Sequence, residues 1–155
     1  MFPKWHVLFG FIFSLLLFLI FPEINALEAS ILFFSSFLID VDHYLYYVFR
    51  KRKLGILSAY NWFVIHGKRF RQLSKEEKLK HYCSILIFHG IEPLILLFFL
   101  SQIFPLFYFI LLGFVFHLLL DYAYEIKVGR VTNKFSLFLH IIKVRRLLHV
   151  EDLKN

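Results

Sequence analysis

The chain has 155 residues, of which 59% are hydrophobic, 19% are charged and 22 are phenylalanine. A soluble domain of this size has too little interior to bury so much apolar surface, so the composition excludes an ordinary soluble domain and favours a protein of the lipid bilayer. The net charge of +7 does not indicate a nucleic-acid partner, because the basic residues lie beside apolar segments, where membrane topology already accounts for them.

Four apolar segments are long enough to cross a bilayer, which requires about 20 mostly apolar residues in a helix. In chain order they are residues 5–21, 26–49, 82–104 and 105–124. We therefore predict an all-α membrane protein in which residues 1–155 form a single integral membrane domain. The last two segments are joined by a short turn and are expected to form a helical hairpin.

Positive charge determines the predicted orientation. Ten Lys and Arg residues lie between the second and third segments, seven follow the fourth, and Lys4 precedes the first. The other two connections contain no basic residue. Because basic loops stay on the cytoplasmic side, both termini and the loop of residues 50–80 are expected to face the cytoplasm.

Two further segments are predicted to lie on the membrane surface. Residues 55–67 are apolar and contain Trp62, which suits the headgroup zone. Residues 133–150 combine an apolar face with basic residues, which is typical of a helix attracted to anionic lipid headgroups. Thr132 or Asn133 would cap this helix. Packing of the helix on the protein's own cytoplasmic side is an equal alternative.

Seven ionisable side chains fall inside the predicted membrane segments. Acidic and His residues are costly at such positions, so they indicate a functional site. They are Asp40, Asp42 and His43 in the second segment, His89 and Glu92 in the third, and His117 and Asp121 in the fourth.

Helical spacing and depth indicate that these side chains belong together. Each of the three segments carries an acid and a His at i,i+3 or i,i+4, which places the pair on one helix face. Counted from the cytoplasmic ends at 1.5 Å per residue, all three pairs fall in a layer about 5–15 Å deep. Asp42 lies about 100° around the helix from His43, so it can join only from the flank or through a local distortion.

Imidazoles and carboxylates at one depth form the donor set of a metal site. We expect one or two divalent ions, with zinc preferred over manganese or iron. Glu92, the deepest carboxylate of the third segment, is the predicted general base. The predicted ligands are Asp42, His43, His89, His117 and Asp121, with Asp40 as a bridging or outer carboxylate. The alternative is that these side chains only pair with one another to hold the helices together.

Two motifs resemble the YdjM-like family of inner-membrane metal-dependent hydrolases. They are FLIDVDHYL at residues 37–45 and GFVFHLLLDY at residues 113–122. The family typically carries L-P-D-x-D-H in an early span and G-x-x-x-H-x-x-x-D in a late one. Ile39 replaces the family's proline, and the family's H-R-G-x-T-H-S element has no clear counterpart, so His89 and Glu92 are assigned from their chemistry alone.

The resemblance implies an inner-membrane protein of a prokaryote. It also implies a distant relation to the all-helical zinc phospholipase C and nuclease proteins, and hence phosphoester hydrolysis. We therefore expect a membrane-embedded metal-dependent hydrolase that acts on a phosphoester in or near the bilayer. The expected partners are the bilayer and its anionic headgroups, with no nucleic acid.

Two other functions fit the same residues. A divalent-cation or proton transporter also requires intramembrane His and acidic side chains. It would need a polar path to the outer leaflet, where the predicted segments carry few polar residues. The second alternative is a non-catalytic membrane scaffold that is stabilised by the metal.

Overall fold

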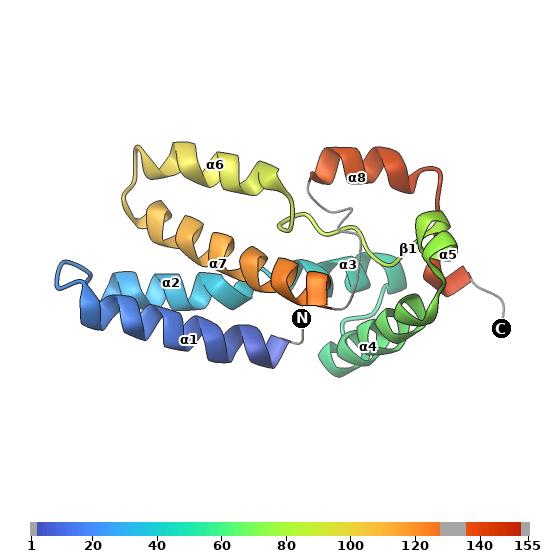
Figure 1. Ribbon diagram of the computed structural model, residues 1–155, viewed down its shortest axis with the longest axis horizontal. Coiled ribbons are helices and arrows are strands. Elements are labelled where there is room, and N and C mark those ends of the chain that lie inside the picture. The colour runs from blue at the N-terminus through green and yellow to red at the C-terminus, as the bar shows by residue number, and fades with distance from the viewer. Residues whose placement is uncertain (1–2, 128–135, 153–155) are drawn as a thin grey trace.

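The computed structural model describes residues 3–127 and 136–152, and most of them are helical, which confirms the helical class (Figure 1). Four helices form a bundle: α1 (Pro3–Ile20), α2 (Ala26–Leu38), α6 (Ile91–Ser101) and α7 (Leu106–Lys127). Beyond one end of the bundle lies a second group of elements, which we call the cap. It consists of α3 (Val41–Lys51), α4 (Ile56–Gln72), α5 (Lys75–Lys80), β1 (His81–Tyr82), α8 (Leu137–Val144), β2 (Leu148–His149) and the 3-10 helix η1 (Val150–Asp152).

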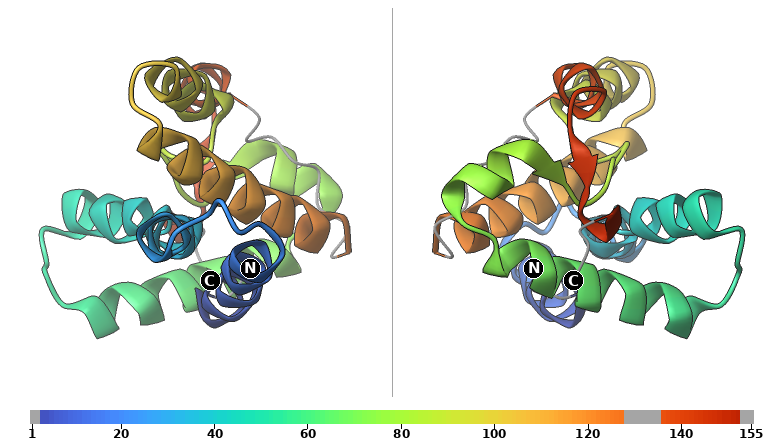
Figure 2. Two further views of the ribbon diagram at one scale, coloured as in Figure 1. Left: turned by 90° about the vertical axis from the view of Figure 1, so that its left-hand side faces the viewer. Right: turned by 90° about the vertical axis from the view of Figure 1, so that its right-hand side faces the viewer.

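Helix α7 is the centre of the bundle. It contacts α1, α2 and α6, and the end-on views show it between α6 on one side and α1 and α2 on the other (Figure 2). Its connection to α6 is short, as the predicted hairpin requires. The connection from α1 to α2 ends in a capping box, in which the Asn25 side chain accepts hydrogen bonds from the amides of Leu27 and Glu28 while the Glu28 carboxylate accepts one from the Asn25 amide.

Two of the bundle helices, α1 and α7, are long and apolar enough to cross a membrane. Only 17% of the residues in the most apolar stretch of each helix are buried inside the protein, so most of their apolar side chains face outward. Helices α2 and α6 have 13 and 11 residues, which corresponds to about 20 Å and 17 Å of helix. The described residues therefore do not confirm four full-length spans.

The predicted segment 26–49 is two helices rather than one. The chain tightens after Leu38, where the Asp40 amide donates to the Phe37 carbonyl at 3.2 Å and the His43 amide donates to the Asp40 carbonyl at 3.0 Å. Such i→i+3 bonds interrupt the regular helix. The turn is a local distortion of the kind that Asp42 needed in order to join its neighbours.

The predicted segment 82–104 is helical only from Ile91 onward, which corrects its boundary. Tyr82 lies in a strand, and residues 83–90 connect the strand to α6 without regular structure. Pro93 is the third residue of α6, where its missing N–H loses no intrahelical hydrogen bond. Proline therefore fits the first turn of a helix here, and no kinked helix continues back through His89.

The two predicted surface segments lie in the cap. Helix α4 packs on α3 through Trp62 and Ala59, while Ile56 and Leu57 stay exposed. Within the described part of residues 133–150, α8 spans Leu137–Val144 with Ser136 as its N-cap. The predicted caps at residues 132 and 133 lie outside the described residues. One face of α8 is buried and the other presents exposed apolar side chains, so packing against the protein involves one face only.

Close helix contact at Gly113 gives a first prediction. A β-carbon at this position would lie 2.8 Å from the Leu32 carbonyl oxygen and 2.9 Å from the Ser36 amide nitrogen, both backbone atoms of α2. Gly113→Ala should therefore push α2 away from α7 and lower the free energy of unfolding by about 1–3 kcal/mol. Thermal unfolding in detergent measures this loss. Gly67→Ala is the control, since its β-carbon would meet only the end of the Arg71 side chain, at 3.5 Å. Equal melting temperatures for the two variants would contradict the proposed close contact.

The C-terminal end of the cap gives a pH-dependent prediction. Burial alone would raise the pKa of the Glu151 carboxyl, but the Lys51 ammonium and the Trp62 indole N–H outweigh burial, so the pKa lies below its ordinary value of 4.5. A lowered pKa contributes stability above pH 4.5 that is lost as the pH falls through the folded-state pKa. The melting temperature of the natural protein should therefore exceed that of Glu151→Gln at neutral pH, and the difference should shrink in acid. A difference that does not change with pH would contradict this role.

Candidate metal centre

The six predicted ligands come together where the bundle meets the cap. They are supplied by three parts of the chain that are far apart in sequence: the start of α3, the connection before α6, and α7. Asp40 is the residue before α3 and Asp42 and His43 lie in its first turn, His89 lies just before α6, and His117 and Asp121 lie one turn apart on α7. The structure thus brings these six side chains together, while their role as metal ligands stays a prediction.

At the centre of this cluster, two imidazole nitrogens face two carboxylate oxygens at nearly the spacing of ligands around a metal ion. The Nε2 atoms of His89 and His117 lie 3.6 Å from Asp40 Oδ1, and they lie 3.7 and 3.8 Å from Asp121 Oδ2. Two ligand atoms about 2.0–2.1 Å from a tetrahedral zinc ion are roughly 3.3–3.4 Å apart. The cluster is therefore a few tenths of an ångström wider than a closed zinc site, and it can hold a metal ion.

His117 is held so that one nitrogen is left for a ligand role. Its ring is fully buried, and Nδ1 donates to the Ser36 carbonyl of α2 at 2.8 Å. That bond places the proton on Nδ1 and leaves Nε2 with a lone pair. Nε2 is buried and has no hydrogen-bond partner among the described residues. A buried acceptor without a partner is costly, and a bound cation would satisfy it.

Asp42 supports His89 from behind. Its side chain is 2% exposed, and Oδ2 accepts hydrogen bonds from the Phe88 amide at 2.9 Å and from His89 Nδ1 at 3.0 Å. His89 therefore presents Nε2 to the cluster, and its orientation depends on a carboxylate, as is usual for metal-binding histidines. Asp42 thus acts on His89 and does not itself belong to any of the groups whose ligand atoms converge.

His6 is a member of the cluster that the sequence analysis did not select. The ring is 1% exposed, stacks on His117 with centroids 3.9 Å apart, and places Nε2 3.2 Å from Asp121 Oδ1. His6 lies one residue inside the predicted segment 5–21, about 1.5 Å from its cytoplasmic end. That depth is outside the layer of about 5–15 Å, so the depth argument does not select His6.

Glu92 has a different place from the one predicted. Its carboxylate accepts hydrogen bonds from the Ser136 hydroxyl at 2.6 Å and from the amides of Leu137 and Phe138 at 3.0 and 3.1 Å. These groups form the N-terminus of α8, whose first amides have no partner within the helix. Both oxygens are engaged there, and Glu92 belongs to none of the described groups that could hold a metal. The position of Glu92 at the start of α8 therefore argues against the predicted role of general base.

The new place of Glu92 gives a further prediction. Glu92→Ala removes three hydrogen bonds from the start of α8 and should lower the free energy of unfolding by about 1–3 kcal/mol, while metal content stays unchanged. Thermal unfolding and metal analysis of the same sample check both parts. Glu28→Ala is a matched control, because Glu28 also caps a helix but is remote from α8. Loss of metal from Glu92→Ala at unchanged stability would contradict the capping role.

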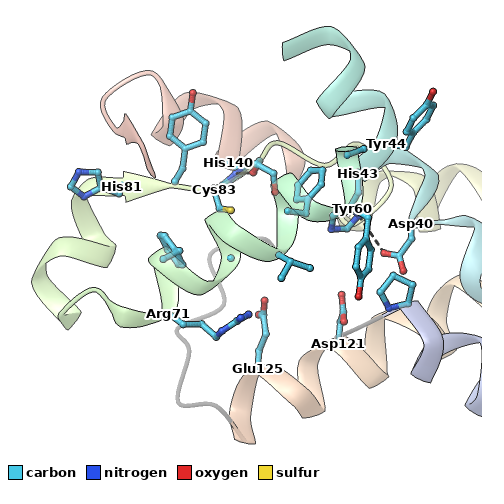
Figure 3. A pocket seen from close by; sticks show the side chains of 18 of the residues that line it. Asp40, His43, Tyr44, Tyr60, Arg71, His81, Cys83, Asp121, Glu125 and His140 are labelled. Carbon is cyan, nitrogen blue, oxygen red and sulfur yellow. Dashed lines mark hydrogen bonds and ion pairs between the residues drawn. The ribbon is translucent and has the colours of Figure 1, made fainter. Parts of the chain in front are cut away.

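A cavity of about 750 Å³ opens beside the cluster. Asp40, His43 and Asp121 line it from the bundle side, and Figure 3 shows these side chains at one end of the cavity. The His43 ring is 31% exposed, and Nδ1 lies 3.1 Å from Asp42 Oδ1 and 3.3 Å from Asp40 Oδ1. The cluster is thus open to a small molecule on one side and closed by α1, α2 and α7 on the other.

Four further histidines lie outside the cluster. His81 lines the cavity. His66 is buried against Trp62 and donates to the Trp62 carbonyl. His140 and His149 are also buried.

Comparison of the chain with protein-family models, with curated proteins and with solved structures gave no match. The resemblance to the YdjM-like family therefore stays a prediction. The donor set and its geometry are the findings on which a functional proposal can rest.

Proposed function

We propose that this protein is a membrane-embedded, metal-dependent hydrolase that acts on a phosphoester in or near the bilayer. The observation that carries the proposal is that two imidazole nitrogens each lie 3.6–3.8 Å from oxygens of two carboxylates, beside an open cavity. A purely structural cluster has no need of a cavity against its ligand atoms. His89, His117 and Asp121 would hold the first ion, with Asp40 beside them. The chemistry supplied by a bound divalent metal is polarisation of the phosphorus–oxygen bond and a lowered pKa for a bound water.

His43 is the group best placed to accept a proton. It lines the cavity, and its Nδ1 lies close to the carboxylates of Asp42 and Asp40. A carboxylate beside one ring nitrogen stabilises the imidazolium that forms when the other nitrogen takes a proton. His43 therefore replaces Glu92 in the role of general base. With a second ion present, it could serve as a ligand instead, together with Asp40 and His89.

The proposal includes an orientation in the membrane. Helices α1 and α7 cross the bilayer, α2 and α6 lie beside them, and the cap faces the cytoplasm, where the Lys and Arg residues of the 50–80 loop belong. Exposed apolar side chains such as Leu19 and Phe99, 68% and 63% exposed, would then contact lipid chains. A prokaryotic inner membrane is the location that the sequence resemblance implies.

Transport is the less favoured function. Away from the cap, the buried polar residues of the bundle include Ser14 and Ser35, and each hydroxyl donates to a carbonyl of its own helix. Such bonds leave few groups to solvate an ion beyond the cluster. The cavity also lies on the cap side of the cluster.

Metal analysis of protein purified without chelator tests the proposal, together with phosphate release from a generic phosphoester. We expect about one or two divalent ions per chain, and hydrolysis that a chelator abolishes and added metal restores. Protein that contains no stoichiometric metal and gains no stability from Zn²⁺ or Mn²⁺ would refute the proposal. Cation or proton flux into reconstituted vesicles that disappears in His117→Ala would favour the transporter.

A further inference from the structure

Three cations line the cavity at some distance from the metal-binding cluster. Arg71, Lys78 and Lys143 come from three different helices, α4, α5 and α8, and each side chain is half-buried. The sequence alone gave no reason to group them, because it placed them in separate cytoplasmic segments. The fold directs all three toward one enclosed space.

These cations have no ion pair among the described residues, in contrast to other cations of the cap. Lys51 and Arg50 both pair with Glu151. The residues outside the described ranges contain no Asp or Glu, so the acidic side chains of the protein are accounted for. Three half-buried cations that face one cavity give it a positive potential that favours an anionic ligand, and Glu125 is the acidic residue that lines the cavity beyond the cluster.

Arg71 shares the cavity with two acidic residues of α7. In the view of Figure 3, Glu125 is drawn between Arg71 and Asp121, and all three line the cavity. Glu125 and Asp121 are separated by four residues on α7, and side chains at that spacing are about 5–6 Å apart at their β-carbons. A phosphate group at the cluster and a second negative charge nearby could therefore be bound at the same time.

The wall between the two charged ends is mainly apolar and aromatic. Tyr60, Phe63 and Phe70 of α4 line it, and Leu147 closes it from the segment after α8. A volume of about 750 Å³ is within the usual range of small-molecule pockets, about 300–1,000 Å³. A ligand that fills this space needs an apolar part as well as a charged head.

We propose, building on the hydrolase function proposed above, that the substrate is a lipid phosphate whose head carries two or more negative charges. The phosphoester lies at the Asp40–Asp121 end of the cavity. Arg71, Lys78 and Lys143 supply the positive potential that attracts the doubly charged phosphate of a monoester, and they bind the second phosphate group of a diphosphate directly. The aromatic wall of α4 contacts the start of the lipid chain. A phosphate monoester and a diphosphate share this chemistry.

Binding to detergent-solubilised protein, measured in chelator, tests the inference without any turnover. The probe is didecanoyl phosphatidate, compared with didecanoyl phosphatidylcholine, which has the same chains without net charge, and with glycerol 3-phosphate, which has the head without chains. We expect phosphatidate to bind at least about tenfold more tightly than either, because hydrogen bonds to charged groups typically contribute a factor of this size. Farnesyl diphosphate extends the series: tighter binding than phosphatidate assigns the site to diphosphates, and weaker binding assigns it to monoesters.

Charge-removing variants assign the binding to the cations. Arg71→Gln and Lys143→Gln should each weaken phosphatidate binding by about tenfold, while Arg71→Lys should retain most of the affinity. Lys68→Gln on α4 and Arg146→Gln after α8 are the matched controls, because both residues are exposed and neither lines the cavity. Melting temperatures in chelator show that each variant is folded.

The outcomes separate this inference from the function on which it rests. Metal-containing protein whose phosphatidate affinity is the same in Arg71→Gln, Lys143→Gln and the controls would overturn the inference and leave the hydrolase proposal standing. Equal affinity for phosphatidylcholine would also overturn it. Protein that binds phosphatidate through Arg71 and Lys143 but never binds metal would refute the hydrolase and support an anionic lipid site.

Discussion

Replacing His117 with alanine is expected to remove the bound metal and to lower the melting temperature of the metal-loaded protein by more than about 5 °C. His117 is fully buried, and its Nε2 faces Asp40 and Asp121. A ligand present at 1,000 times its dissociation constant stabilises the folded state by about 4 kcal/mol, and each kcal/mol is about 2–4 °C for a chain of this size. Loss of the imidazole should remove most of this stabilisation by bound metal.

The control for this prediction is His149→Ala. His149 is also buried, at 2% exposed, but its Nε2 donates to the Cys83 carbonyl and it belongs to none of the groups that could hold a metal. His149→Ala should therefore lose stability from altered packing and keep its metal. In chelator, the difference between natural protein and His117→Ala should shrink to the packing contribution alone. Metal at natural stoichiometry in His117→Ala would contradict the assignment of His117 as a ligand.

The cluster could be predicted from sequence because its members are chemically conspicuous. An acid or imidazole inside an apolar segment has few inexpensive environments. Helical spacing and depth therefore grouped five residues that the structure brings together, Asp40, His43, His89, His117 and Asp121, but also Glu92, which it places at α8. That argument counts 1.5 Å per residue and so assumes a helix from the cytoplasmic end of each segment. His89 joins the cluster although residues 83–90 are not helical.

Helix boundaries and the role of Glu92 could not be predicted in the same way. A continuous apolar run has the same pattern whether it forms one helix or two helices joined by a tight turn. The assignment of Glu92 assumed that it shares a helix face with His89, but His89 precedes the helix, so the i,i+3 rule does not apply. The cavity cations were missed for another reason, because cytoplasmic Lys and Arg are already explained by membrane topology.

Asp42 is expected to have the second-largest effect, and two substitutions separate its two contributions. Asp42→Asn keeps an oxygen that can accept from the Phe88 amide, but it replaces the charged acceptor of His89 Nδ1 with a weaker neutral one. Removing such a supporting carboxylate typically costs 10- to 100-fold in metal affinity. Asp42→Asn should therefore fold normally in chelator and bind zinc about 10- to 100-fold more weakly than the natural protein.

Asp42→Ala should lose both metal affinity and stability. The Phe88 amide and His89 Nδ1 both lose their acceptor at a position that is 2% exposed, and each unsatisfied buried donor costs about 1–3 kcal/mol. The melting temperature should fall even in chelator, and metal affinity should fall at least as far as in Asp42→Asn. Zinc competition titrations and thermal unfolding with and without chelator check these expectations. Zinc binding by Asp42→Asn as tight as that of the natural protein would show that the carboxylate does not orient His89. Equal stability of Asp42→Ala and Asp42→Asn in chelator would show that the two hydrogen bonds contribute nothing to the fold.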